Sequence, residues 1–404
     1  MKATDKKCPL NSGHWKRQKL KYVASLKSGE TITADQISEA GEYPVYGGNG
    51  HRGFTSRYTH EGDFVLIGRQ GALCGNINYA SGRFWASEHA IVVDTHGKSK
   101  VRWLGELLRS MNLNQFSQSA AQPGIAVEVI AQLEIPVPPL DTQRCIADYL
   151  DRETGRIDAL MAAKERWLEI LAEKRRAVIT NAVTRGLNPD VPLRDSGIPW
   201  LGMIPKHWES KRSKWLFTER DERSTTGDEV LLSLRMEKGL VPHNDVSDKP
   251  TSPEELIGYK KTSVGEIVIN RMRASSGLIA LTPQDGLVSP DYAVYRPANN
   301  CDPRYYTDLF TTELLQRLFR SESTGLGTGS SGFLRLYSEN FLSFWFPAPP
   351  LNEQHDIVSY ISIETERLDA LRTTTEKTIA LLKERRAALI AAAVTGRIEG
   401  VIPA

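Results

Sequence analysis

Basic and amide side chains follow similar strands in the two halves of the chain. Arg69-Gln70 follows "GDFVLIG", and Arg271 and Arg273 follow "GEIVIN" at nearly the same place. Arginine and glutamine make paired hydrogen bonds to base edges, and arginine also binds phosphate. The alternative is a solvated loop end, or an arginine bonded to carboxylates of its own domain. We therefore treat these residues as candidate nucleic-acid contacts, together with a weaker set comprising Arg83, Arg235, Lys238 and Arg335.

The stretch "YPVYGGNGHRGF" has the glycine spacing of a dinucleotide-binding loop, through Gly48, Gly50 and Gly53. Such a loop needs a preceding apolar strand and a following helix whose N-terminus receives the pyrophosphate. Here the strand is short and contains a proline, and "FTSRYTHEGD" is poor helix material. We expect a turn in which glycine allows positive φ, either with or without a ligand. The side chains that would project from it are Asn49, His51 and Arg52.

Catalytic signatures are missing from the sequence. It contains no phosphate-binding P-loop, H-E-x-x-H, C-x-x-C, EF-hand or G-x-S-x-G pattern, and no Asn/Asp-Pro-Pro-Tyr tetrapeptide of adenine methyltransferases. His89 and Asp291 lie in corresponding strands, but each alone fits a structural role better than a catalytic one. We expect no catalytic residue, no metal site and no cofactor in this chain.

Length and composition are those of a globular protein with two or three domains, since the chain has 404 residues, 40% hydrophobic and 25% charged. No run of apolar residues is long enough to span a membrane, and the N-terminus does not resemble a signal peptide. The 4 cysteines lie far apart, which fits a reducing cytoplasm. The net charge of +2 is weak for a protein that binds nucleic acid alone, so local clusters or partners must supply phosphate contacts.

An internal repeat is the strongest signal in the chain. "IPVPPLDTQRCIADYLDRETGRIDAL" begins at Ile135 and "FPAPPLNEQHDIVSYISIETERLDAL" begins at Phe346, a shift of 211 residues. Upstream of each copy lies a longer and more divergent segment, with "GHWKRQKL" or "KHWESKRS" at its start. The order is therefore globular, helical, globular, helical.

Each repeated copy predicts one long helix. A Pro-Pro pair precedes it, Asp141 or Asn352 is a candidate N-cap, and Gly186 or Gly396 closes it. Apolar residues recur at alternating spacings of three and four, as in a heptad seam with several polar positions. We expect two antiparallel helices that pack along these seams, whereas the alternative is two independent domains with their own helical hairpins. The expected seam residues are Ile157, Leu160, Trp167, Leu171 and Val178, with Leu368, Leu371, Leu382 and Leu389.

The globular segments are predicted to be rich in β-structure. Expected strands are Phe64–Ile67, Ala90–Val93, Ile267–Ile269 and Ala293–Tyr295. Expected helices are Val101–Met111 and Pro303–Phe319. The strand pairing does not follow from the sequence.

The sequence resembles the specificity subunits of type I restriction–modification systems over nearly its whole length. The stretches that carry the resemblance are "YPVYGGNGHRG", "GDFVLIGRQGALCGN", "GLVSPDYAVYRP" and "STGLGTGSSGFLRL", with Pro-Pro-Leu-x-x-Gln before each helix. The resemblance implies an α+β fold with two β-rich target recognition domains and two long antiparallel helices that form a coiled coil. Expected boundaries are 1–138 for the first domain, 139–186 for the first helix, 187–349 for the second domain and 350–404 for the second helix and tail.

The family also implies a function that agrees with the missing catalytic motifs. The chain would be a noncatalytic subunit that reads a split, asymmetric target in double-stranded DNA. Two copies of a methyltransferase subunit would use S-adenosylmethionine to methylate adenine, and restriction subunits would use ATP and Mg²⁺ for translocation and cleavage. The alternatives are an enzyme that itself transfers methyl groups, and a scaffold that pairs two proteins without touching DNA.

Overall fold

The computed structural model describes residues 8–9, 15–71, 73–117, 124–236, 238–249, 251–326, 333–398 and 401–402. The chain divides into two compact units, and the division falls inside the two long helices. Unit 1 comprises residues 1–166 and 375–404, and unit 2 comprises residues 167–374. Each unit is described by itself.

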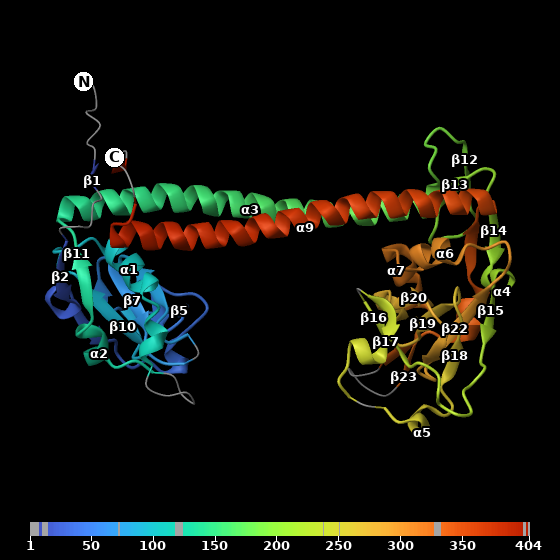
Figure 1. Cartoon of the computed structure of the whole chain (residues 1–404), viewed down its shortest axis with the longest axis horizontal. Helices are drawn as coiled ribbons and strands as arrows, with labels where there is room; N and C mark the ends of the chain where they lie inside the picture. Colours follow the sequence, from blue (N-terminus) through green and yellow to red (C-terminus); the bar gives the residue numbers. More distant parts are fainter. Residues whose placement is uncertain are drawn as a thin grey trace. The chain divides into compact units, whose positions relative to one another are not determined.

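A four-stranded antiparallel sheet organises unit 1. Its order is β3 (Ser25–Ser28), β10 (Ala90–Asp94), β7 (Phe64–Gly68) and β8 (Ile77–Ala80). Helix α1 (Val101–Ser110) packs against this sheet (Figure 1). The apolar runs of β7 and β10 fill the core because both strands are central and covered. The strands predicted at Phe64–Ile67 and Ala90–Val93 and the first predicted helix are confirmed.

A second sheet of unit 1 contains the glycine-rich stretch. Its order is β5 (Gly50–Thr55), β4 (Tyr43–Gly47), β9 (Arg83–Ala86) and β6 (His60–Glu61). β4 and β5 form a hairpin with an irregular register. Gly48 lies in its turn and Gly50 and Gly53 lie in β5, so the glycines do not precede a helix. This geometry is incompatible with a dinucleotide-binding loop.

Unit 2 repeats the main sheet of unit 1. Its order is β15 (Phe217–Arg220), β22 (Tyr292–Pro297), β19 (Ile267–Asn270) and β20 (Ile279–Leu281), again antiparallel. The two strands predicted here, Ile267–Ile269 and Ala293–Tyr295, are therefore confirmed, and the structure shows that they pair with each other. The hairpin of β16 (Leu232–Arg235) and β17 (Gly239–Pro242) packs its leucines on one face of this sheet.

The helical layer of unit 2 differs from the prediction of one helix at Pro303–Phe319. Two helices occur, α6 (Pro303–Phe310) and α7 (Glu313–Ser321). The chain breaks between them because the Thr312 hydroxyl accepts a hydrogen bond from the Leu315 N–H and caps α7.

The remaining elements are short. They are β1 (Cys8–Pro9), α2 (Val127–Ala131), β12 (Leu193–Asp195), β13 (Met203–Pro205), α4 (Ser213–Leu216), α5 (Pro253–Leu256), β18 (Lys260–Thr262), β21 (Gly286–Val288), β23 (Thr324–Leu326), β24 (Phe333–Arg335), α8 (Ser338–Ser343) and β26 (Val401–Ile402).

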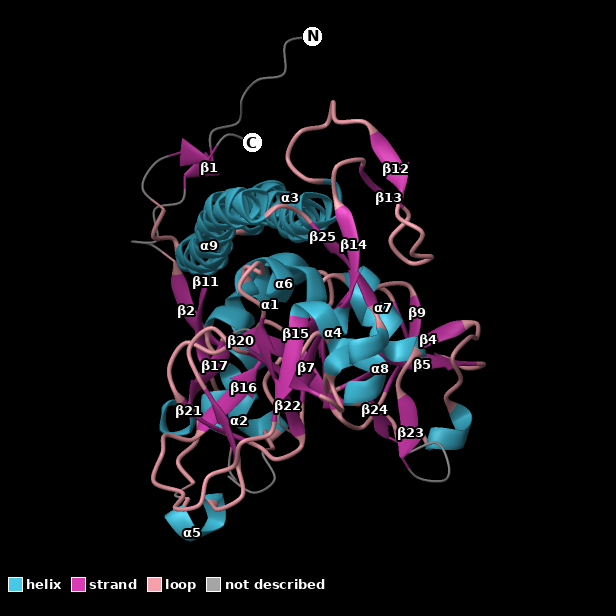
Figure 2. Ribbon diagram, turned by 90° about the vertical axis from the view of Figure 1, so that its right-hand side faces the viewer, coloured by secondary structure: helices cyan, strands magenta, loops and turns pink. Residues whose placement is uncertain are grey.

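A short antiparallel ribbon connects each domain with its long helix. In unit 1, β2 (Lys16–Lys19) pairs with β11 (Glu134–Val137). In unit 2, β14 (Glu209–Arg212) pairs with β25 (Trp345–Ala348), and both are labelled beside one another in Figure 2. The second strand of each ribbon leads through Pro-Pro into a helix, so each helix starts from the ribbon of its own domain.

Helix α3 runs from Leu140 to Arg185 and helix α9 from Leu351 to Thr395. Both start one residue before the predicted N-caps, so that prediction is wrong: Asp141 and Asn352 lie in the first turn, directly after the leucine that follows Pro-Pro. Both helices end before a glycine with positive φ, 74° at Gly186 and 70° at Gly396. A residue in this left-handed conformation ends a helix, as predicted.

The segments of α3 and α9 that share a unit run antiparallel. In unit 1, Leu150 near the start of α3 and Val394 near the end of α9 belong to the same hydrophobic cluster. Further along α3, Asp158 pairs with Arg386 of α9 at 2.8 Å. In unit 2, Arg175 pairs with Asp369 at 3.8 Å. Asp158 and Asp369 are equivalent under the repeat shift of 211, and so are Arg175 and Arg386. The same ion pair therefore occurs in each unit, with the roles of the helices exchanged.

The buried seam differs from the predicted one at three positions. Ile157, Leu171 and Leu368 are buried, and Val178, Leu382 and Leu389 are partly buried. Leu160, Trp167 and Leu371 are exposed, so their assignment to the seam is wrong. Met161 and Leu168, one residue after Leu160 and Trp167, are partly buried instead, and in α9 Ile379 is buried. The sequence fits both phases because apolar side chains occur at both positions, and packing selects one.

Among the helices of the described residues, none is long and apolar enough to cross a membrane.

Candidate nucleic-acid interface

Corresponding ends of the two main sheets gather the predicted contact residues. In unit 1, Gly68 of β7 pairs with Ala90 of β10, and Arg69 and His89 lie one residue beyond. In unit 2, Asn270 of β19 pairs with Tyr292 of β22, so Arg271 and Asp291 occupy the same place. We call these two regions the polar ends of the sheets. The matching strand register therefore shows that these positions are equivalent in the two units, although their side chains differ.

The polar end of unit 1 lies against the glycine hairpin. The Gln70 Oε1 atom lies 3.0 Å from the His89 Nδ1 atom. The Nη1 atom of Arg69 donates a hydrogen bond of 3.5 Å to the Glu88 carbonyl. A Cβ added at Gly48 would lie only 2.9 Å from the His89 carbonyl oxygen. Glycine is thus required for the hairpin to approach this end, which brings its side chains close to Gln70.

The hairpin presents three of the predicted residues. Asn49, His51 and Arg52 are exposed. Asn49 Oδ1 accepts a hydrogen bond of 3.5 Å from Asn76, and the His51 ring lies 4.9 Å from the Phe54 ring. These contacts orient Asn49 and His51, and all three residues keep exposed polar groups.

Arg83 lies elsewhere in unit 1. It begins β9, which runs parallel to β4, so it is at the strand end away from the glycine turn. Its guanidinium pairs with Glu61 at 3.2 Å and lies 5.1 Å from the centre of the Tyr58 ring. The structure therefore does not bring Arg83 together with Arg69 and Gln70.

Arg271 belongs to an internal charge network of unit 2. Its Nη2 donates to Glu219 Oε1 at 2.6 Å, and the side chain is largely buried. The buried ammonium of Lys260 also approaches Glu219, at 3.6 Å, and Asp221, at 2.9 Å. The hydrogen bond from Lys260 lowers the pKa of Asp221 and so favours its ionised form. Arg271 thus forms the bond to its own domain's carboxylate that the sequence left open.

Arg335 is held in a similar way, whereas Arg273 is not. Arg335 approaches Asp291 at 3.4 Å and lies 5.7 Å from the Tyr337 ring centre. Arg273 is exposed, and no ion pair to it occurs in the described part of the chain. Of the three arginines, Arg273 is the one with an open guanidinium.

Arg235 reaches the same end of the unit 2 sheet from the β16–β17 hairpin. It lines a cavity of about 240 Å³ with Ser289 and Tyr292, the residues around the start of β22. His243 also lines this cavity and lies 2.8 Å from the Ser233 hydroxyl. Sequence reasoning missed Tyr292 and His243, although the aromatic directly after "SPD" was a usable signal. Lys238 is exposed in the turn of the same hairpin.

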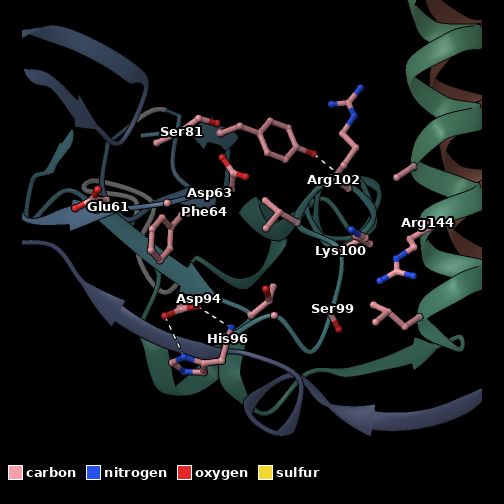
Figure 3. A pocket seen from close by; sticks show the side chains of 18 residues that line it. Glu61, Asp63, Phe64, Ser81, Asp94, His96, Ser99, Lys100, Arg102 and Arg144 are labelled. Atoms are coloured by element: carbon pink, nitrogen blue, oxygen red, sulfur yellow. Dashed lines mark hydrogen bonds and ion pairs between the residues drawn. The ribbon is translucent and has the colours of Figure 1, made fainter. Parts of the chain in front are cut away.

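The opposite end of the unit 1 sheet carries a larger cavity of about 710 Å³ (Figure 3). Asp94 and His96 lie on one side, and Arg102 and Arg144 on the other. These groups are paired: Asp94 with His96 at 3.1 Å, and Arg102 with Asp151 at 2.7 Å. Of these pairs, Arg102–Asp151 connects α1 with α3.

A buried glutamine fixes each long helix to its domain. Gln143 Nε2 donates to the Pro138 carbonyl at 2.9 Å, and its Oε1 accepts from the Lys100 N–H at 2.8 Å. Gln354 makes the equivalent bonds, 2.9 Å to Pro349 and 2.7 Å from Asp302, with a further 3.2 Å bond to Asn300. The two side-chain amides satisfy backbone groups at the start of α1 and just before α6. Each domain is therefore oriented on its own helix by the same contact.

No group of three or more histidine, cysteine, aspartate or glutamate residues arranged to hold a metal ion occurs within the described ranges.

Two domains built on one plan, with dissimilar polar ends and equivalent helix junctions, define a protein with an internally duplicated architecture. The family model described as "Type I restriction modification DNA specificity domain" matches residues 13–169 and 220–382, and the chain belongs to this family. It is thus a DNA sequence-recognition subunit of the type I restriction–modification class.

Proteins of similar sequence agree with this assignment. The chain is 42% identical over 141 residues to the type I restriction enzyme EcoprrI specificity subunit of Escherichia coli, a match that covers 34% of this chain and 35% of that one. A putative type I specificity subunit of Haemophilus influenzae is 25% identical over 80% of both chains.

The fold is that of solved specificity subunits. A chain from a study of complex assembly and conformational transition of the type I system matches with a TM-score of 0.69 and 16% identity, covering 96% of this chain and 99% of that one. The HsdS subunit of Thermoanaerobacter tengcongensis matches with a TM-score of 0.55 and 16% identity, covering 96% and 98%.

Proposed function

We propose that the chain is the noncatalytic subunit that reads a two-part, asymmetric DNA target, and that each polar end reads one part. The observation that carries this proposal is the contrast between the two domains. Their sheets share one strand order and one helix junction, whereas their polar ends carry different side chains. Two dissimilar polar ends, carried by equivalent sheets and helix junctions, fit a DNA target with two dissimilar halves.

The candidate DNA-contact residues fall into groups according to whether their polar atoms are already paired within the domain. The open group comprises Asn49, His51, Arg52, Gln70, Arg235, Lys238 and Arg273, which carry the direct contacts to bases or phosphates. Arg69 lies between this group and the next, since its side chain bonds the Glu88 carbonyl and the residue is partly buried. Arg83, Arg271 and Arg335 are paired with carboxylates, so they orient the domain or contact DNA only after giving up a partner.

The long helices set the distance between the two half-sites and bind the partner subunits. Two copies of a methyltransferase subunit supply S-adenosylmethionine and adenine methylation, and restriction subunits supply ATP-dependent translocation and cleavage. The partners also provide most of the phosphate contacts that a chain with a net charge of +2 lacks. The complex works in the cytoplasm, where its DNA is found.

Co-expression with the cognate methyltransferase tests this function. Methylation of genomic DNA should occur at one interrupted motif with two different halves, and the chain alone should produce none. Methylation at a continuous motif would contradict the proposal. The second candidate, a scaffold without DNA contact, predicts that exchanging the polar ends leaves the motif unchanged.

A further inference from the structure

An exposed lysine and aromatic pair follows the first ribbon strand of both domains. The Lys21 ammonium lies 5.2 Å from the centre of the Tyr22 ring, and Lys214 lies 5.4 Å from Trp215. Tyr22 is 67% exposed and Trp215 is 70% exposed, so each ring leaves a large apolar surface in water. Neither lysine forms an ion pair with a carboxylate in the described part of the chain. A pair of this kind is suited to a partner with an apolar pocket and a nearby carboxylate.

Backbone contacts show that the two pairs occupy equivalent places. The Leu20 N–H donates to the Leu133 carbonyl at 2.9 Å, and the Ser213 N–H donates to the Phe344 carbonyl at 2.7 Å. The two acceptors differ by 211 residues, which is the shift of the helical repeat. The neighbouring side chains differ between the copies, but the lysine and the exposed aromatic recur.

The pairs lie away from the polar ends of the sheets. Strand β3 begins beside Asp94 at the end of β10, and β15 begins beside Pro297 at the end of β22. The polar ends lie at the starts of β10 and β22. The two regions are therefore separated by the length of a strand, roughly 13–17 Å for the steps from the first to the last residue of β10 or β22 at ~3.3 Å each. DNA read at a polar end would not meet the lysine and aromatic pair of the same domain.

We propose that Lys21–Tyr22 and Lys214–Trp215 are docking points for two copies of one protein partner, the methyltransferase subunit. This inference rests on the proposed function, which requires two such copies. Half-sites of different sequence need different reading surfaces, whereas two copies of one partner need the same surface twice. The aromatic ring is the anchor, and the lysine pairs with a carboxylate at the rim of the partner's pocket.

The test uses the full chain co-expressed with its methyltransferase. We expect Tyr22→Ala to weaken binding of one methyltransferase copy by about tenfold or more, and Trp215→Ala to weaken the other equally, because truncated aromatic anchors commonly cost this much. Native mass spectrometry at limiting concentration should show one copy lost in each variant and both in the double variant. Tyr58→Ala is the matched control, since Tyr58 is 42% exposed and has Arg83 5.1 Å from its ring centre. It should assemble fully.

Wild-type stoichiometry and affinity in both single variants would overturn the inference. A loss of DNA affinity with intact assembly would also overturn it, since the surface would then contact DNA. Should an alanine variant unfold, as judged by circular dichroism, Lys21→Glu and Lys214→Glu replace it with the same expected loss of binding. Failure of the wild-type chain to assemble, or to direct methylation at an interrupted motif, would instead count against the proposed function.

Discussion

Replacing Gln354 by methionine should loosen the second recognition domain from its helix. Gln354 is 1% exposed, and its amide bonds two carbonyls and one N–H. Methionine has a similar volume but leaves all three groups unpaired. Since an unpaired buried polar group costs about 1–3 kcal/mol, and water can reach part of this site, we expect a loss of roughly 3 kcal/mol in the free energy of unfolding unit 2.

The equivalent change, Gln143→Met, is the matched control. Gln143 bonds one carbonyl and one N–H, so it leaves two groups unpaired and should cost roughly 2 kcal/mol in unit 1. Thermal unfolding measures both losses, and a loss of 3 kcal/mol should lower the melting temperature by about 6–12 °C in a domain of this size.

Hydrogen exchange locates the effect. In Gln354→Met, protection of the Asp302 amide should fall, and protection of the Lys100 amide should not. The reverse is expected for Gln143→Met. A change in unfolding free energy below about 0.5 kcal/mol in both variants, with unaltered exchange at these amides, would refute the view that the glutamines fix the domains to their helices.

Three other predictions concern separate parts of the molecule. Arg273→Ala should weaken DNA binding by the assembled complex without lowering stability. Arg271→Ala should lower stability, because it removes the 2.6 Å bond to the partly buried Glu219 and leaves that carboxylate only the longer contact with Lys260. Equal effects of the two variants in binding and unfolding assays would argue against this division. Burial raises the pKa of Asp308 to about 7, so ionising it disfavours the folded state, and stability should fall as pH rises from about 4 to 7 and then level off. In Asp308→Asn, the part of this fall due to Asp308 should disappear from pH-dependent unfolding curves. Deleting residues 161–167 and 372–378 together removes about 10 Å of each helix and should shorten the gap in the methylated motif by about three base pairs, with its letters unchanged.

The sequence predicts the long helices and their ends better than it predicts the side-chain contacts at the polar ends of the sheets. Proline pairs and glycines bound α3 and α9 because they act through local backbone geometry. The repeat identifies Gln143 and Gln354 as equivalent residues, but the carbonyls that they bind become visible only after folding. The glycine hairpin could be separated from a nucleotide loop because the residues after Gly53 are poor helix formers.

The pairing of arginines and the choice of seam residues, which the sequence left open, depend on side-chain contacts in the folded protein. Arg271 and Arg273 are two residues apart and chemically identical, yet one is paired with Glu219 and the other is exposed. This difference depends on strand pairing between β15, β22 and β19, which no local pattern reveals. The seam phase of α3 has the same origin, since Leu160 and Met161 both suit a seam and only packing chooses between them.

The most direct test of the account is an exchange of residues 13–138 for the corresponding domain of another specificity subunit, followed by mapping of methylated motifs in the co-expressed complex. We predict that one half of the motif changes, while the other half and the gap remain. A change in both halves, or in neither, would contradict the claim that each domain reads its own half of the target.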